Sequence, residues 1–212
     1  MYQTVSTYCD KHNVQLIAVS KTRTNEAILE KYDAGQRVFG ENRVQELVSK
    51  HETLPKDIQW HLIGHLQTNK VKYIAPFVQM IHSVESEKLL NVINKEALKN
   101  ERIIDVLLQV HVAQEESKFG LNKEAYFDLL ELFSQGSFAG IRLRGIMGMA
   151  SFTNDMDQVR TEFQSINQLF AESKEKHSAI PYFDQISMGM SGDYKIAVEE
   201  GSTMIRVGSL IF

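Results

Sequence analysis

One lysine stands where a short apolar run of the chain ends. Residues 15–21 read QLIAVSK, so Lys21 closes a segment that is typical of a buried strand. Partial burial at a strand end disfavours the ammonium form and lowers the pKa of a lysine, which leaves a neutral amine able to attack a carbonyl group. A lysine in this position can also simply extend its charged end into solvent. Lys21 is therefore a candidate Schiff-base lysine that needs support from elsewhere in the chain.

Two segments rich in small residues, late in the sequence, supply that support. Residues 187–193 read SMGMSGD and combine hydroxyl groups with glycines at the expected start of a helix, where backbone amides favour an anion. Residues 206–209 read RVGS and add a cation, a glycine and another hydroxyl. Each segment alone is typical of an ordinary turn. Together with Lys21 they predict a site for a phosphorylated carbonyl compound.

These three segments require a fold that brings them to the same end of the molecule. Short apolar or β-branched runs alternate with helical patterns, which predicts a parallel sheet with crossover helices. Eight runs with seven helical patterns between them indicate a single α/β domain that spans residues 1–212. They favour a (β/α)8 TIM barrel rather than an open doubly wound sheet. In such a barrel the functional residues lie where the strands end. The expected strands are Gln15–Lys21, Arg37–Glu41, Ile58–Gly64, Met80–Val84, Asp105–Val112, Arg142–Met149, Gln185–Met188 and Thr203–Val207.

Two of the connecting segments carry a clear helical signature. Apolar residues recur every three or four positions, so each helix would cover the sheet with one face. Ser86 precedes the first helix and Asp155 or Asp157 precedes the second, as expected for side chains that cap free amides. The apolar positions are Leu89, Ile93 and Ala97 in the first helix and Val159, Phe163, Ile166 and Phe170 in the second.

Composition excludes several classes of function. The formal net charge is −4, and basic residues are scattered among acidic ones, so we expect no nucleic-acid partner. The lone cysteine, Cys9, cannot form an internal disulfide, and we expect it to be a small, partly buried side chain. No stretch approaches the roughly 20 apolar residues of a membrane helix. These features predict a soluble, cytoplasmic protein.

Motifs along most of the chain resemble those of one known family. In order they are AVSKT, FGENRVQE, WHLIGHLQTNK, ESKFG, RLRGIMGM, SMGMSGDY and GSTMIRVGSLIF, from Ala18 to Phe212. This series resembles the pyridoxal phosphate homeostasis family, which is similar to the barrel domain of alanine racemase without its second domain. The resemblance implies a TIM barrel that binds pyridoxal 5'-phosphate in the cell.

The resemblance also implies a role for individual residues. Lys21 would hold the cofactor as a Schiff base, and Arg206 would approach it near the ring nitrogen. The implied phosphate contacts are Ser187, Gly189, Ser191, Gly208 and Ser209. The residues implied to line the ring pocket are Asn42, His61, Met147 and Met149.

Three functions remain open from the sequence. The first is a carrier that buffers pyridoxal phosphate and delivers it to apo-enzymes, with little catalysis of its own. An arginine cannot donate a proton fully to the ring nitrogen, so carbanion chemistry should be weak, and no motif places a tyrosine opposite Lys21 as a second base. The second is a weak amino-acid racemase, and the third is a cofactor-free aldolase in which Lys21 meets a sugar phosphate. We expect a monomer, since no long apolar stripe is evident.

Two further features have ordinary interpretations. His61 and His65 lack a third ligand at metal-binding spacing, so we expect pocket lining or hydrogen bonding rather than a metal site. Lys118 is typical of a solvated charge, although its loop lies over the cofactor side in related proteins, which makes it a hypothetical secondary contact.

Overall fold

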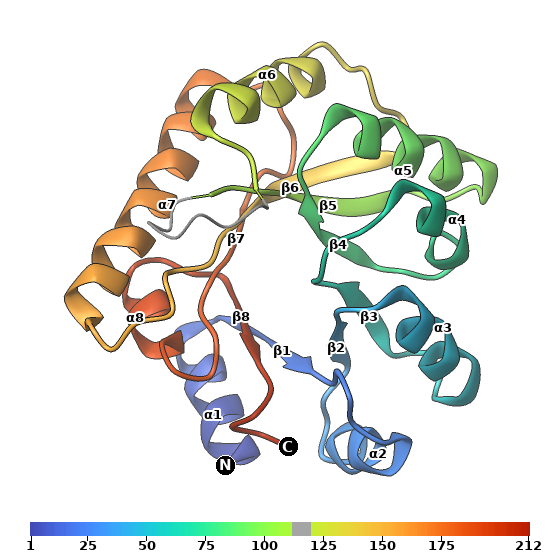
Figure 1. The fold of residues 1–212 in the computed structure, drawn as a ribbon, viewed down its shortest axis with the longest axis vertical. Coiled ribbons are helices and arrows are strands. Elements are labelled where there is room, and N and C mark those ends of the chain that lie inside the picture. The colour runs from blue at the N-terminus through green and yellow to red at the C-terminus, as the bar shows by residue number, and fades with distance from the viewer. Residues whose placement is uncertain (112–119) are drawn as a thin grey trace.

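Parallel strands pair in chain order and the last pairs with the first, which closes the sheet into a barrel (Figure 1). This computed structural model describes residues 1–111 and 120–212. The predicted (β/α)8 barrel is confirmed, with strand bounds within three residues of those expected except at Val112, which lies outside the described residues. The strands are β1 Gln15–Val19, β2 Val38–Glu41, β3 Gln59–Leu62, β4 Met80–Val84, β5 Ile104–Gln109, β6 Ile141–Met147, β7 Gln185–Ser187 and β8 Met204–Val207.

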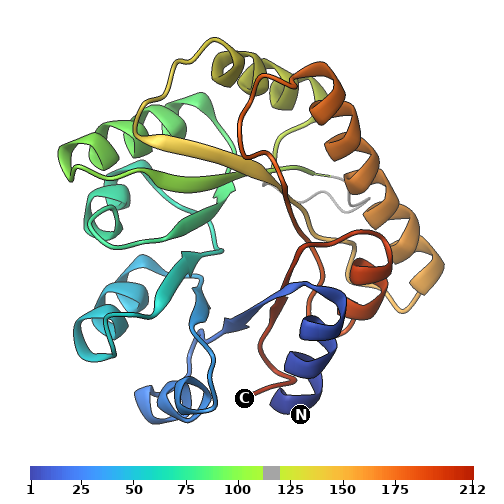
Figure 2. The same cartoon turned by 180° about the vertical axis from the view of Figure 1, so that it is seen from behind.

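The helices lie outside the ring of strands (Figure 1). One helix precedes β1 and the others connect successive strands, so each apolar helix face packs on the barrel wall. Figures 1 and 2 both show the two chain ends side by side. The helices are α1 Tyr2–His12, α2 Asn25–Asp33, α3 Val44–Thr53, α4 Val71–Ile74, preceded by the 3₁₀ turn η1 Thr68–Lys70, α5 Glu87–Lys99, α6 Lys123–Ser134, α7 Met156–Lys176 and α8 Tyr194–Glu199.

The predicted helix starts are capped by side chains. The hydroxyl of Ser86 accepts a hydrogen bond from the Leu89 amide at 3.3 Å. Asp155 accepts from the amides of Asp157 and Gln158 at 3.1 and 3.0 Å, so Asp155 is the cap and Asp157 already belongs to α7. Capping pairs amides that a helix start leaves free, which fixes where these crossovers begin.

Burial separates two apolar regions. The larger lies between the strands and the helices and contains the predicted faces of α5 and α7. The smaller fills the inside of the barrel, because side chains alternate between the two faces of a strand. Its members are Ile17, Val38, Met80, Leu107, Met147 and Met204. The barrel has a carboxyl-end mouth, where the strands end, and an amino-end mouth, where they begin.

Three sequence predictions concern other features. Cys9 is buried in α1, more fully than expected, and burial raises the pKa of its thiol to about 11. Lys118 lies outside the described residues. Among the helices that are described, none has the length and apolar character needed to cross a bilayer.

Candidate functional site

Lys21 lies in the turn that follows β1, at the carboxyl end of the barrel. The strand ends at Val19, and Thr22 adopts a left-handed backbone conformation with φ 62° that takes the chain away from the sheet. The side chain of Lys21 is exposed, so the partial burial expected for a strand-end lysine is not observed. The reason is that β1 ends two residues earlier than predicted, which places Lys21 on the rim rather than in the wall.

Arg206 is a buried cation in β8, the strand beside β1. Its side chain donates to the hydroxyl of Ser187 at 2.6 Å and to the carbonyl of Gly148 at 3.0 Å. Among the described residues no carboxylate forms an ion pair with it, although Asp193 is near enough to act on its charge. Burial lowers the pKa of Arg206 to about 10, and the charge of Asp193 acts in the opposite direction. The guanidinium therefore stays charged at neutral pH.

Two buried histidines extend this contact across the barrel interior. His82 Nδ1 lies 3.0 Å from the Ser187 hydroxyl, and His82 Nε2 lies 2.9 Å from His61 Nδ1. Burial lowers the pKa of His61 to about 3 and that of His82 well below its usual value, so both rings are neutral near pH 7. Arginine can only donate, so Ser187 accepts from Arg206. Each of these contacts is a hydrogen bond if the Ser187 hydroxyl donates to His82 Nδ1 and His82 Nε2–H donates to His61 Nδ1.

Two of the predicted site residues, Ser187 and His61, lie buried in the barrel interior. The sequence predicts a phosphate contact at Ser187, and the structure places its hydroxyl in the barrel interior between Arg206 and His82. His61 was expected beside a ring pocket, and its side chain is buried two hydrogen bonds away from Ser187. Both residues are thus connected to Arg206 through the barrel core.

The loops after β7 and β8 meet each other and the end of β1. Gly189 has φ 95°, and a Cβ there would lie 2.5 Å from that of Ala197. The amide of Gly208 donates to the hydroxyl of Ser191 at 3.3 Å. A Cβ on Gly208 would lie 3.1 Å from the carbonyl oxygen of Val19, so glycine allows this close approach to the strand that leads to Lys21. Ser209 follows and is exposed.

The residues predicted to surround a ring occupy different depths. Asn42 directly follows β2 and is half-buried. Met147 ends β6 and is buried in the interior cluster, whereas Met149 lies two residues beyond and is 42% exposed. The structure thus brings Lys21, Asn42, Met149, Ser191, Gly208 and Ser209 to the carboxyl-end rim, with Arg206, Ser187, His61 and Met147 below it.

A cavity of about 690 Å³ lies at the opposite, amino end of the strands. It is lined by residues that begin strands, including Gln15, Gln59 and Gln185, together with His61 from the interior. Its arginine is paired: Arg144 lies 2.9 Å from both Asp105 and Asp184. Size alone does not mark a functional site here, because barrel chemistry occurs at the carboxyl ends of the strands and the cation of this cavity already has carboxylate partners.

The described residues contain no cluster of side chains suited to hold a metal ion. His61 contacts His82, and His65 Nδ1 lies 2.9 Å from a carboxylate oxygen of Glu85.

Two buried polar residues near the predicted site, His82 and Lys50, were not expected from the sequence. His82 lies within the apolar strand β4, and the signal was its spacing of two from Met80, which places both side chains inside the barrel. Lys50 is buried and bonded to Glu41 and Glu46 beneath the Lys21 turn. Its signal was the four-residue spacing from Glu46, which puts both side chains on one helix face.

Comparisons with known proteins identify the family. Residues 2–212 match the model of the alanine racemase N-terminal domain. The chain is 40% identical over 200 residues to the pyridoxal phosphate homeostasis protein of Aquifex aeolicus, covering 93% of this chain and 86% of that one. It is 38% identical over 203 residues to the protein of that name from Schizosaccharomyces pombe, covering 94% and 84%.

Solved structures agree with the sequence matches. PipY of Synechococcus elongatus, solved without and with pyridoxal phosphate bound, superposes with TM-scores of 0.92 and 0.90 at 34% identity, covering 100% of this chain and 99% of that one. Alanine racemase of Bartonella henselae, at 15% identity and a TM-score of 0.68, shares the fold over 98% of this chain and 56% of its own. The resemblance seen in the sequence motifs is confirmed: this chain belongs to the pyridoxal phosphate homeostasis protein family.

Proposed function

We propose that this chain binds pyridoxal 5'-phosphate through a Schiff base on Lys21, and that it buffers and delivers the cofactor with little turnover of its own. The support from relatives is the family name and the PipY structure with the cofactor bound. Within this scheme residues 1–212 act as one cofactor-binding domain, the protein is a monomer, and apo-enzymes that use the cofactor receive it.

The observation that carries the proposal is the state of Arg206. A buried cation is costly unless it is paired, and Arg206 has a hydroxyl and a carbonyl as partners but no ion pair among the described residues. It lies in the strand beside β1, whose end carries Lys21. An acceptor or anion bound at this mouth would complete its surroundings, so the residues present fit a cofactor that has a ring nitrogen and a phosphate.

We assign the remaining contacts by depth. On the rim, the main chain and hydroxyls of the loops after β7 and β8 would hold the phosphate, and Asn42 and Met149 would border the ring. Below it, Met147 and His61 form the floor. Ser187 would act mainly by orienting Arg206, which it contacts at 2.6 Å. The rim residues assigned to phosphate are Gly189, Ser191, Gly208 and Ser209.

The same arginine argues against efficient catalysis. The bound cofactor supplies an aldehyde for the lysine and, in enzymes, a pyridine that withdraws electrons from the substrate. Arg206 keeps its proton and can only donate a hydrogen bond, so beside the ring nitrogen it would leave a bound pyridine a weaker electron acceptor than a proton donor would. A racemase also needs a second proton donor opposite the lysine. No motif places Tyr73, Tyr126, Tyr182 or Tyr194 there, and Tyr126 is fully buried against Ser173.

Absorption spectra test the proposal. Wild-type protein mixed with pyridoxal phosphate should show the visible band of a Schiff base, and Lys21→Ala should lack it. Lys123→Ala, which removes an exposed lysine on α6, is the matched control and should keep the band. Absence of the band from the wild type would contradict the proposal and favour a cofactor-free aldolase.

Isotope exchange separates a carrier from a weak racemase. In heavy water, the loaded protein should incorporate no deuterium at the α-carbon of any amino acid in a broad panel. Rapid incorporation that requires Lys21 would replace the carrier by an enzyme.

A further inference from the structure

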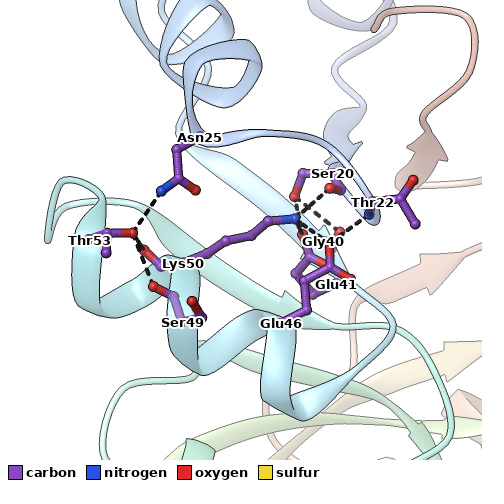
Figure 3. A network of polar contacts seen from close by, with 9 residues as sticks. All are labelled: Ser20, Thr22, Asn25, Gly40, Glu41, Glu46, Ser49, Lys50 and Thr53. Carbon is purple, nitrogen blue, oxygen red and sulfur yellow. Dashed lines mark hydrogen bonds and ion pairs between the residues drawn. The ribbon is translucent and has the colours of Figure 1, made fainter.

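A buried lysine lies beneath the turn that carries Lys21. Lys50, in α3, is 5% exposed, and its ammonium group contacts three oxygens. They are the carbonyl of Ser20 at 2.7 Å, Glu41 Oε1 at 2.7 Å and Glu46 Oε1 at 2.6 Å. An ammonium group has three protons to donate, so these contacts use all of them. Figure 3 shows the side chain reaching from its helix to the point where the three oxygens converge.

The two carboxylates continue the network to both neighbours of Lys21. The hydroxyl of Ser20 donates to Glu41 Oε1 at 2.6 Å. The amide of Thr22 donates to Glu46 Oε1 at 2.6 Å. Residues on either side of the lysine are therefore held by the same group of charges (Figure 3).

This arrangement is costly for a purely structural role. Glu41 is fully buried, one of its oxygens has no partner among the described residues, and burial raises its pKa. Thr22 has φ 62°, a left-handed conformation that a β-branched residue adopts only when its surroundings impose it. Apolar residues often replace a buried ion pair without loss of stability. In this chain the network contacts the backbone on both sides of Lys21, at the Ser20 carbonyl and the Thr22 amide.

We propose that Lys50 is a positioning residue of the cofactor site, which with Glu41 and Glu46 fixes the Ser20–Thr22 turn so that the amine of Lys21 points at the cofactor aldehyde. The inference rests on the proposed role of Lys21. It adds that Lys50, Glu41 and Glu46 determine the rate at which Lys21 binds and releases the cofactor, although none of the three needs to contact the cofactor.

Two measurements on Lys50→Met test this. In cofactor-free protein, amide hydrogen exchange of the segment 20–23 should rise at least tenfold. At a temperature where the protein is fully folded, the rate of Schiff-base formation with pyridoxal phosphate should fall at least tenfold. Arg144→Met, which breaks a partly buried ion pair at the other end of the barrel, should change neither quantity. A merely structural role would lower the melting temperature and leave the rate of the folded protein unchanged.

A milder variant keeps the test decisive if Lys50→Met does not fold. Glu46→Gln retains an oxygen for the Thr22 amide and removes one charge from a partly exposed position. Both effects should then be at least threefold. Unchanged exchange and unchanged rate in a folded variant would overturn the inference. If wild-type protein forms no Schiff base at all, the proposed function fails, whereas the exchange measurement still decides whether Lys50 fixes the turn.

Discussion

The two mouths of the barrel are both polar but differ in how their charges are satisfied. At the amino end, Arg144 pairs with Asp105 and Asp184 around a cavity of about 690 Å³. At the carboxyl end, Arg206 is more deeply buried and lacks an ion pair among the described residues. An ion pair already compensates the cost of burying a charge, whereas a buried cation without an ion pair favours binding of an acceptor or anion. Pairing of the buried arginine, rather than cavity size, distinguishes the end of the barrel that carries the proposed cofactor site.

Removal of each arginine should show the largest contrast. Arg206→Met should weaken pyridoxal phosphate binding by about ten- to hundredfold, because a hydrogen bond from a charged group contributes about 1.5–3 kcal/mol. Arg144→Met should leave affinity within about twofold, since its charge is used within the protein. Titration followed by absorbance measures both. Equal losses in the two variants would show that the ends do not differ as described.

Alanine substitutions at two glycines with positive φ, Gly189 and Gly136, compare a tightly packed loop with an open one. Gly189→Ala should destabilise the fold by about 2–4 kcal/mol, because it adds strain at φ 95° and a contact of 2.5 Å with Ala197. Gly136→Ala, at φ 74° with open space around it, should cost about 1 kcal/mol. Urea unfolding measures the difference. Similar costs would mean that the loop after β7 is not tightly packed.

The buried histidines connecting the two ends should make stability depend on pH. His61 has a pKa of about 3 in the fold, against about 6.5 when unfolded. Between these values the unfolded chain binds more protons, so stability is present above pH 6.5 and is lost as pH falls towards 3. His61→Gln, which keeps an acceptor for His82, should reduce this slope by up to about 1.4 kcal/mol per pH unit. An unchanged slope would contradict a neutral, buried His61.

The sequence predicted the barrel because each strand is a short apolar run and each crossover has one apolar face. The apolar spacing of α5 and α7 matched the buried residues closely. Lys21 and Arg206 could be selected because both stand at or near the ends of such runs. The exposure of Lys21 was not predictable, since it depends on β1 ending at Val19.

What sequence reasoning could not reach is contact across the barrel. Ser187 and His82 come from strands far apart in the chain, and their hydrogen bond exists only because the sheet closes. The contact of Lys50 with the carbonyl of Ser20 joins residues 30 positions apart, which meet because α3 follows β2 and β2 pairs with β1. A lysine or serine in a sequence shows its chemistry but not its partner.

The most direct test of the central claim is to find where the cofactor attaches. Wild-type protein loaded with pyridoxal phosphate is reduced with borohydride, digested and mapped by mass spectrometry. We expect a reduced pyridoxyl group on Lys21 and no other stoichiometric label. Label on another lysine, or none, would contradict it.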